Sequence, residues 1–315
     1  MAEHKLRIVY MGTPDFAVLP LKKIIEAGFQ VVGVVTNPDK PAGRGQKFQE
    51  SAVKKYAREV GLKILQPEKF RDEHFLQELQ ALKADLQLVV VWNMPPLGTV
   101  NLHASLLPDY RGAAPINRVL MNGERMTGVT TFLLRQEVDT GNIIFQQKVE
   151  IGADMTAGEL HDILMETGAD LLLKTVETIE KDDYPLVDQR NLLKGREAIM
   201  APKIFKEDMK IHWDWEIDRI YNHIRGLSPF PAAWTELKNK HTGETVSLKI
   251  FKADKTEEQH SHCPGEYAIE HKDSLSVFVK KGILHIREVQ LAGKKRMPVS
   301  EFLKGFHLAD YFFTH

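Results

Sequence analysis

The stretch Asn101-Leu102-His103 places an amide and an imidazole two positions apart in the chain. If Val100 to His103 forms the end of a strand, side chains alternate across it, so Asn101 and His103 project from one face. The amide can donate a hydrogen bond there, and the imidazole can gain or lose a proton near neutral pH. The same pair also suits a purely structural role, as satisfied polar groups at a strand terminus.

A carboxylate follows in Asp139-Thr140-Gly141, which lies between apolar runs at 129–133 and 143–145. A carboxylate beside an imidazole can fix its tautomer and stabilise its charged form. However, Asp-Thr-Gly is also typical of a hairpin turn, because Asp and Gly favour turn conformations. Neither this segment nor the Asn-x-His pair, taken singly, decides between chemistry and structure.

The N-terminal half that contains these residues alternates strand-like and helix-like segments. Such alternation favours an α/β fold with a parallel sheet and crossover helices. Thr13 and Pro14 follow the first strand and predict the cap and first turn of a helix. Thr156 and Glu159 match a capping box, which predicts the start of a long helix. Strands are predicted at 6–11, 31–35, 64–65 and 86–91, and helices at about 14–28, 51–60 and 72–82.

The C-terminal part changes to a period of two, which is typical of strands. Lys280-Lys281-Gly282 lies between two such runs and predicts a hairpin turn. The segment before this part is rich in Pro, Asp, Asn and Gly and is interpreted as a linker. We therefore predict a first domain at 1–184, a linker at 185–204 and a small β-rich domain at 205–315.

Bulk properties limit the function classes. A net charge of −1 over 315 residues means that any nucleic-acid contact must use local positive charge. The one cysteine, Cys263, cannot form an internal disulfide, and no signal peptide or membrane-length apolar run is apparent, so a cytoplasmic location is expected. The cluster His260-Ser261-His262-Cys263 lacks a second ligand pair, so we expect no metal. No Gly-x-Gly-x-x-Gly follows the first strand, which weighs against a dinucleotide cofactor.

Together the motifs become specific. The stretch 101–116, NLHASLLPDYRGAAPI, resembles the signature of the folate-dependent formyltransferases, and Asp139-Thr140-Gly141 matches their second catalytic element. Further motifs resemble the methionyl-tRNA formyltransferases within that family and extend the similarity over nearly the whole chain. They are MGTPDFA at 11–17, NPDKPAGRGQK at 37–47, APKI at 201–204, RGLSPFPAAW at 225–234 and LAGKKRM at 291–297.

This resemblance implies a Rossmann-like catalytic domain followed by an OB-like β-barrel domain that binds tRNA. It implies a monomer that transfers the formyl group of 10-formyltetrahydrofolate to the amino group of methionyl-initiator tRNA. Asn101 would donate to the developing oxyanion and His103 would accept or relay the amine proton or, when protonated, donate to the oxyanion. Asp139 would orient the imidazole or act through a water, and these proton routes stay open.

The resemblance also assigns binding residues. A basic loop at 37–47 and a basic cluster near the C-terminus would contact tRNA phosphates. The folate site would be lined by Ser105, Leu106, Leu107 and Pro108. The tRNA contacts would be Lys40, Arg44 and Lys47 in the loop and Lys294, Lys295 and Arg296 in the cluster. Lys280 and Lys281 would add to the positive face of the second domain.

Three alternatives share parts of this pattern. Amino-sugar formyltransferases and a 10-formyltetrahydrofolate hydrolase have the same Asn-x-His and Asp core, and a non-catalytic tRNA-binding protein could use the same scaffold. One departure also stands out. The family has a connecting segment where Val91 adjoins Trp92 here, so we predict that several residues beside the pterin site are missing from this sequence.

Overall fold

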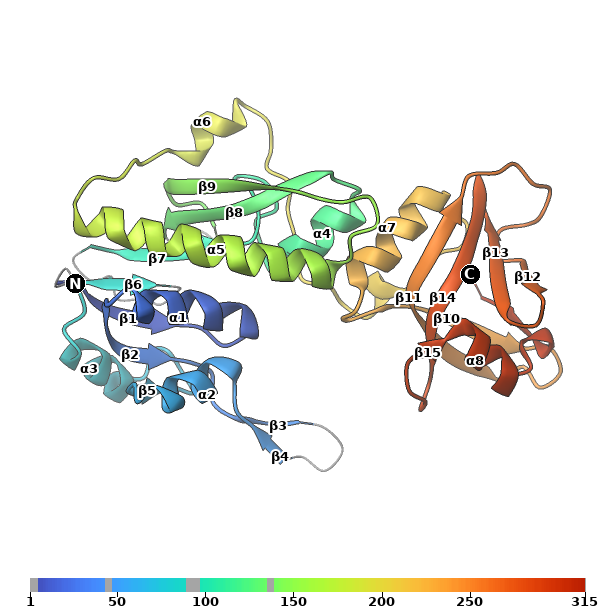
Figure 1. The fold of residues 1–315 in the computed structure, drawn as a ribbon, viewed down its shortest axis with the longest axis horizontal. Coiled ribbons are helices and arrows are strands. Elements are labelled where there is room, and N and C mark those ends of the chain that lie inside the picture. The colour runs from blue at the N-terminus through green and yellow to red at the C-terminus, as the bar shows by residue number, and fades with distance from the viewer. Residues whose placement is uncertain (1–4, 43–46, 89–96, 135–138, 315) are drawn as a thin grey trace. The chain divides into compact units, whose positions relative to one another are not determined.

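The computed structural model describes residues 5–42, 47–88, 97–134 and 139–314. The chain divides into two compact units (Figure 1). Unit 1 comprises Met1–Gly112, Met126–Glu150 and His161–Met200, and unit 2 comprises Ala113–Arg125, Ile151–Leu160 and Ala201–His315. Two short segments from the N-terminal half therefore group with the C-terminal residues, and most of the segment predicted as a linker groups with unit 1.

Unit 1 is built on one mixed, mostly parallel sheet. Its strands, in spatial order, are β5 (Ile64–Leu65), β2 (Gln30–Val35), β1 (Arg7–Met11), β6 (Leu86–Leu88), β7 (Thr99–His103), β8 (Met126–Leu133) and β9 (Ile143–Glu150). The pairs from β5 to β7 are parallel, whereas β7 with β8 and β8 with β9 are antiparallel. The predicted α/β class is confirmed, and the antiparallel pairs extend the sheet beyond the parallel strands.

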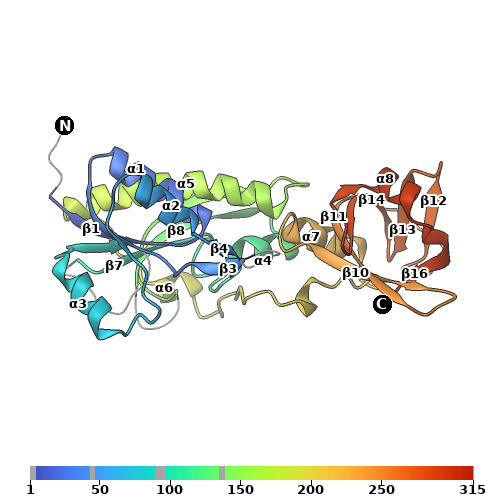
Figure 2. The ribbon, with the colours of Figure 1, turned by 90° about the horizontal axis from the view of Figure 1, so that it is seen from below.

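Helices cover both faces of this sheet because successive residues of the buried strands are apolar and point to opposite faces. Ile8 and Tyr10 of β1 belong to the core shared with helices α1 (Val18–Glu26), α2 (Ala52–Glu59) and α5 (Ala157–Glu180). Val9 and Met11 face the other way, toward α3 (Glu73–Ala81). Figure 2 shows α1, α2 and α5 on one side of the sheet and α3 on the other. The site described below lies at the end of β7, on the sheet face away from α5.

Several predicted helix starts are confirmed by their caps. The Ser51 hydroxyl accepts a hydrogen bond from the Lys54 amide at 3.0 Å, and the Asp72 carboxylate accepts one from the Phe75 amide at 3.0 Å. The capping box is also present. The Thr156 amide donates to the Glu159 carboxylate at 2.8 Å, and the Glu159 amide donates to the Thr156 hydroxyl at 3.3 Å.

The predicted cap at Thr13 is wrong. A short 3₁₀ helix, η1 (Asp15–Ala17), precedes α1, and neither helix has a side-chain cap. The Thr13 hydroxyl instead accepts a hydrogen bond from the Asn37 amide at 3.2 Å. The residues after β1 run beside those after the neighbouring parallel strand β2, so a backbone donor from that strand's end takes the place of the helix amide.

Unit 2 is an antiparallel half-barrel with helices packed against it. Its strands are β12 (Tyr267–Glu270), β13 (Ser274–Val279), β14 (Gly282–Leu291), β11 (Thr245–Thr256), β10 (Ala233–Asn239) and β16 (Tyr311–Phe313), with β15 (Met297–Pro298) beside β14. The predicted turn at Lys280-Lys281 joins β13 to β14, where Val279 pairs with Gly282. The helices are α4 (Pro115–Met121), α7 (Ile217–Leu227) and α8 (Val299–Gly305), with 3₁₀ turns η2 (Glu207–Met209) and η3 (Leu308–Asp310).

No helix within the described ranges is long and apolar enough to span a membrane.

Candidate active site

Asn101 and His103 lie on one face of β7, near its carboxyl end. Asn101 is 8% exposed and His103 is 7% exposed, so both side chains are buried. Leu102, between them, points to the opposite face and packs against α5, where a Cβ at Gly168 would lie 3.0 Å from it. The strand's alternation therefore turns the amide and the imidazole together toward the face away from α5.

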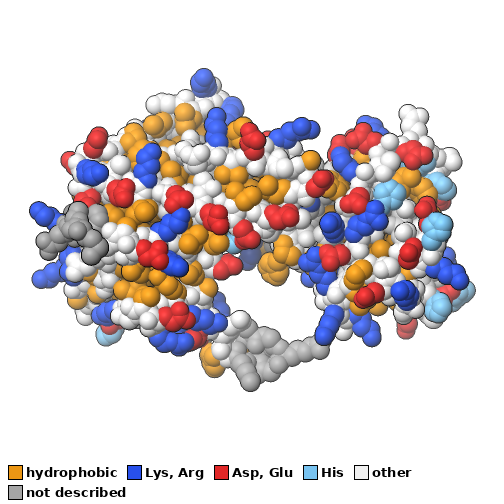
Figure 3. Space-filling view, viewed as in Figure 1, with side chains coloured by type: hydrophobic (Ala, Val, Ile, Leu, Met, Phe, Trp, Pro, Cys, Tyr) orange, Lys and Arg blue, Asp and Glu red, His pale blue; other side chains and the backbone are white. Residues whose placement is uncertain are grey.

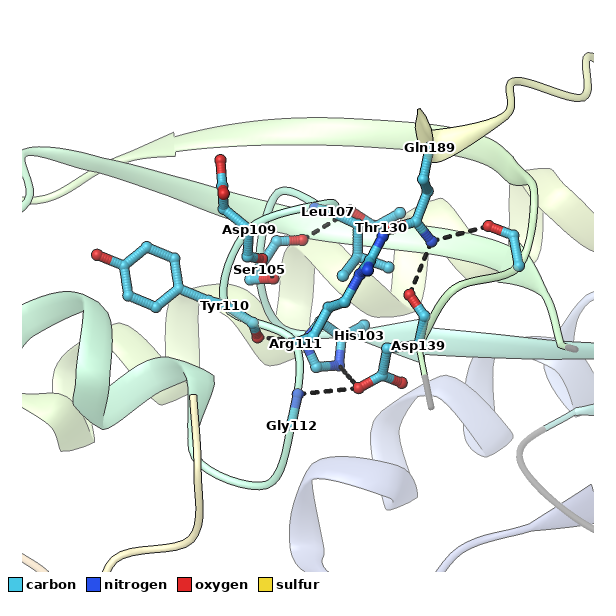
Figure 4. A network of polar contacts seen from close by, with 11 residues as sticks. His103, Ser105, Leu107, Asp109, Tyr110, Arg111, Gly112, Thr130, Asp139 and Gln189 are labelled. Atoms are coloured by element: carbon cyan, nitrogen blue, oxygen red, sulfur yellow. Dashed lines mark hydrogen bonds and ion pairs between the residues drawn. The ribbon is translucent and has the colours of Figure 1, made fainter. Parts of the chain in front are cut away.

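The two ring nitrogens of His103 face different partners. Nε2 lies 2.8 Å from the Tyr110 carbonyl oxygen, and Nδ1 lies 3.8 Å from a carboxylate oxygen of Asp139 (Figure 4). A carbonyl oxygen can only accept, so Nε2 must carry the proton that it donates. Nδ1 is then the nitrogen that can take up a further proton. The 3.8 Å separation exceeds a direct hydrogen bond but lies within ion-pair distance when the imidazole is protonated.

Asp139 lies in the loop of the β8–β9 hairpin. Its backbone has a φ of +54°, a left-handed conformation that Asp tolerates better than most residues. The carboxylate accepts a hydrogen bond from the Gly112 amide at 3.0 Å while facing His103. The hairpin role and the catalytic role considered for this segment are thus compatible, because the turn itself aims the carboxylate at the imidazole.

Gly141 has a packing reason in this turn. A Cβ at this position would lie 1.5 Å from the backbone oxygen of Leu133, a distance that no side chain can adopt. The loop therefore closes against the end of β8 only with glycine there.

The residues assigned to folate are mostly occupied by internal contacts. The Ser105 hydroxyl donates to the Asp109 carbonyl at 2.7 Å, and the Leu107 amide donates to the Thr130 hydroxyl at 3.1 Å. Leu107 and Pro108 are buried, whereas Leu106 is partly exposed. These contacts make the loop after β7 rigid, and they leave Leu106 as the side chain of the four with the most open surface.

Two residues with direct contacts at this site were not identified from the sequence. Gln189, in the short helix α6 (Gln189–Leu193), donates to the carbonyl oxygens of Asp139 and Gly141, both at 2.8 Å. Its side-chain oxygen accepts from Arg111 at 2.7 Å. A polar residue in a Pro- and Asn-containing stretch carries no pattern that distinguishes it from a loop residue. A useful signal is that Arg111 lies inside the long 101–116 motif and needs an acceptor.

The basic loop of the first domain is flanked by a β-hairpin. Strands β3 (Lys40–Ala42) and β4 (Lys47–Gln49) pair antiparallel, and the Lys40 side chain is exposed. The predicted tRNA contact Arg44 lies outside the described residues, as does the Lys47 side chain. The hairpin base is anchored by Asp39, whose carboxylate accepts from Lys54 at 2.6 Å. This bond, and a second one from Gln66, hold the pKa of the Asp39 carboxyl below its ordinary value.

The second basic cluster lies in the turn between β14 and β15. Lys294 and Lys295 are exposed. Arg296 pairs with Glu288 and stacks over the Phe251 ring at 4.5 Å, so its charge is partly neutralised within unit 2. Figure 3 shows basic and acidic side chains interspersed over the visible face of unit 1. Contact with a polyanion would therefore depend on such local clusters.

The histidines near Cys263, considered above as metal ligands, contact the neighbouring strand β13. His260 Nε2 lies 2.9 Å from the Val279 carbonyl, and the His262 ring stacks on Phe278 with centroids 3.8 Å apart. Within the described ranges, no three His, Cys, Asp or Glu side chains are grouped as metal ligands. The join between Val91 and Trp92, where we predict missing residues, lies outside the described residues.

Family comparisons agree along the whole chain. Residues 5–176 match the family described as formyl transferase, and residues 203–307 match the formyl transferase C-terminal domain. A methionyl-tRNA formyltransferase from Parabacteroides distasonis is 51% identical and covers 99% of each chain. One from Bacteroides fragilis is 49% identical and covers 99% of this chain and 98% of the relative.

Solved structures with the same fold are more distant in sequence. The N-formyltransferase from Helicobacter canadensis, solved with folinic acid and dTDP-3-aminofucose, has a TM-score of 0.61 at 19% identity and covers 89% of this chain and 98% of its own. A sugar 3N-formyl transferase has a TM-score of 0.63 at 21% identity, and the match covers 93% of this chain and 100% of that one. These two likenesses concern the fold, whereas the sequence matches identify the relatives. The chain belongs to the formyl transferase family, and within it to the methionyl-tRNA formyltransferases.

Proposed function

We propose that this chain transfers the formyl group of 10-formyltetrahydrofolate to the amino group of methionyl-initiator tRNA, as a monomer in the cytoplasm. The observation that carries the proposal is the 49–51% identity to methionyl-tRNA formyltransferases over both domains. The grouping of buried Asn101, His103 and Asp139 at one end of β7 supports it, because formyl transfer needs an oxyanion donor and a proton acceptor together.

In this proposal the methionyl amine attacks the formyl carbon, the new N–C bond forms, and the bond from that carbon to folate nitrogen N10 breaks. The Asn101 amide donates to the oxygen that becomes negative. The amine proton leaves by way of His103 Nδ1, since Nε2 is committed to the Tyr110 carbonyl. Asp139 stabilises the resulting imidazolium, directly or through a water, and the proton is finally delivered to N10.

The binding residues are proposed on the same basis. The loop of Ser105, Leu106, Leu107 and Pro108 borders the folate, with Leu106 its most open side chain. Lys40, Arg44 and Lys47 of the β3–β4 hairpin and Lys294, Lys295 and Arg296 of the β14–β15 turn contact tRNA phosphates. The exposed Phe48 of β4, which is 74% accessible, adds an aromatic surface next to the hairpin's basic residues.

One assay separates this function from the alternatives. Purified protein is given 10-formyltetrahydrofolate with methionyl-initiator tRNA, with a dTDP-amino sugar, or with water alone. We expect formylated methionyl-tRNA, with rates on the sugar and on water at background level. Faster formylation of the sugar, or folate hydrolysis without tRNA, would contradict the proposal. Failure of all three reactions with tight tRNA binding would identify a non-catalytic binding protein.

The catalytic assignment is tested by His103→Ala. We expect kcat to fall by about 10²- to 10⁴-fold, the usual contribution of a general acid or base, with tRNA affinity nearly unchanged. His74→Ala is the matched control, because His74 is an exposed histidine of the same unit. Equal losses of turnover and tRNA affinity in His103→Ala would show that the imidazole is structural.

A further inference from the structure

Gln189 is 1% exposed and uses both ends of its side-chain amide (Figure 4). The nitrogen donates to the Asp139 and Gly141 carbonyl oxygens at 2.8 Å each. The oxygen accepts from Arg111 Nη2 at 2.7 Å and from Nε at 3.2 Å. The amide therefore has partners for both of its N–H groups and for its oxygen.

The bonds to the hairpin loop bear directly on the orientation of the Asp139 carboxylate. Asp139 has a left-handed backbone, which is less stable than an ordinary one and needs support from its surroundings. Gln189 holds the carbonyl of this residue and that of Gly141, two positions later. With the backbone held at these two carbonyls, the Cα–Cβ bond of Asp139 keeps its direction, and the carboxylate faces His103.

The hydrogen bonds from Arg111 to Gln189 help to place the Gly112 amide, which is the second partner of the Asp139 carboxylate. Arg111 directly precedes Gly112, whose amide donates to the Asp139 carboxylate at 3.0 Å. A single buried amide thus ties the backbone of Asp139 to the residue beside its hydrogen-bond donor. Displacing Gln189 would loosen both contacts together.

Gln189 is itself held in place on either side. Before it, Val187 exchanges two backbone hydrogen bonds with Ile143 of β9, at 2.8 and 2.9 Å. After it, Arg196 donates to the Asp109 carboxylate at 2.7 Å, and the Tyr110 amide donates to the Ile199 carbonyl at 2.6 Å. Residues 187–199 therefore form a strap across the two loops that carry Tyr110 and Asp139.

We propose that Gln189 is a positioning residue for formyl transfer, which holds the Asp139 carboxylate in line with His103. This inference rests on the proposed function of the site. It assigns a role to the segment between the two family domains, beyond connecting them. Gln189 acts through the Asp139 loop and the strap, since its amide groups are all committed to protein atoms.

The test compares Gln189→Met, which keeps the length of the side chain but removes all its hydrogen bonds, with Gln189→Glu. The glutamate keeps an acceptor for Arg111 but cannot donate to the two carbonyls. We expect kcat to fall by about 10- to 100-fold in both variants, with KM for tRNA and for folate within about twofold of the wild type. The matched control is Arg190→Ala, because Arg190 is the next residue of α6 and its exposed side chain pairs with Asp188.

A double-mutant cycle separates positioning from a general structural role. If Gln189 acts through Asp139, then Gln189→Met costs little further activity in an Asp139→Asn background. The inference would be overturned if the fold-losses in kcat of the two single variants multiplied in the double variant. It would also be overturned if kcat were unchanged in both Gln189 variants, or if Asp139→Asn kept full activity.

A second readout does not depend on activity. Hydrogen exchange of the amides at 139–143 is expected to be faster in both Gln189 variants than in Arg190→Ala, and unchanged exchange would also overturn the inference. If the wild type shows no formyl transfer, the proposed function fails, and hydrogen exchange still decides whether Gln189 holds the loop.

Discussion

At the scale of single residues, backbone carbonyls fix the tautomer of His103 and the orientation of the Gln189 amide. The Tyr110 carbonyl fixes the Nε2 proton of His103, and the Gln189 amide is satisfied by two carbonyls of the Asp139 loop. A carbonyl on a packed loop moves little, so these side chains keep one orientation before any substrate arrives. The preorganised arrangement lowers the reorganisation that the transfer step requires.

His223 of α7 gives a pH-dependent prediction. Its ring is 3% exposed and Nε2 has no hydrogen-bond partner, and burial lowers its pKa from 6.5 to about 4. Between these values the unfolded chain binds a proton that the folded chain does not. The contribution of the neutral His223 side chain to the free energy of unfolding is therefore complete above pH 6.5 and is lost as the pH falls toward 4. The shift corresponds to about 3 kcal/mol over this range.

Urea unfolding at several pH values between 7.5 and 4.5 tests this. His223→Asn should lower stability at pH 7.5, because it leaves a cavity, but should flatten the loss of stability toward acid. His241→Asn, at an exposed histidine of the same unit, should keep the wild-type slope. If the free energy of unfolding fell equally steeply with pH in the wild type and in His223→Asn, His223 would not be the group responsible for the acid sensitivity.

At the scale of elements, the loop of the β8–β9 hairpin depends on Gly141. A Cβ at Gly141 would overlap the Leu133 carbonyl, so Gly141→Ala must displace the loop or the end of β8. We expect a loss of about 1–3 kcal/mol, as for other overpacked sites, and a fall in kcat because Asp139 moves. Thermal unfolding and formyl transfer measured together check this.

Gly152→Ala is the control for that experiment. A Cβ there meets Met155 at an ordinary 3.7 Å, so the substitution should leave kcat unchanged. A Gly141→Ala protein with wild-type kcat and stability would mean that the loop closes differently in solution.

Local patterns in the sequence predicted the parallel strands, the helices that begin near Ser51 and Asp72, and the capping box at Thr156. These features depend on residues close together in the chain. The cap at Thr13 was predicted wrongly because the Thr13 hydroxyl accepts a hydrogen bond from Asn37, just after the end of the neighbouring strand β2. Gln189 was missed for the same reason, since its partners lie 48 to 78 positions away and two of them are backbone oxygens, which have no residue signature. The Asp139–His103 contact was anticipated by family resemblance, since Asp-Thr-Gly by itself also fits an ordinary turn.

At the scale of the whole molecule, the chain passes five times between the two units, at 112–113, 125–126, 150–151, 160–161 and 200–201. Unit 2 therefore includes residues far from its C-terminal sequence. Asn117 of α4 donates to the Gly226 carbonyl at 2.7 Å, and Arg225 donates to the Met155 carbonyl at 3.0 Å. A fragment cut at the family boundary near residue 203 would lack these partners of α7.

We predict that the full chain unfolds in one calorimetric transition and that an isolated 203–315 fragment is much less stable. The fragment leaves the 7% exposed Arg225 without its Met155 acceptor and uncovers the apolar side of α7 that packs on Met121. Losses of a few kcal/mol in a unit this small correspond to a melting temperature lower by about 10–20 °C. Adding an excess of a peptide of residues 113–125 should restore part of the lost melting temperature, because the peptide binds the folded fragment and not the unfolded one. Two resolved transitions in the full chain, with the fragment melting at the temperature of one of them, would show instead that the C-terminal residues fold independently of the segments threaded through them.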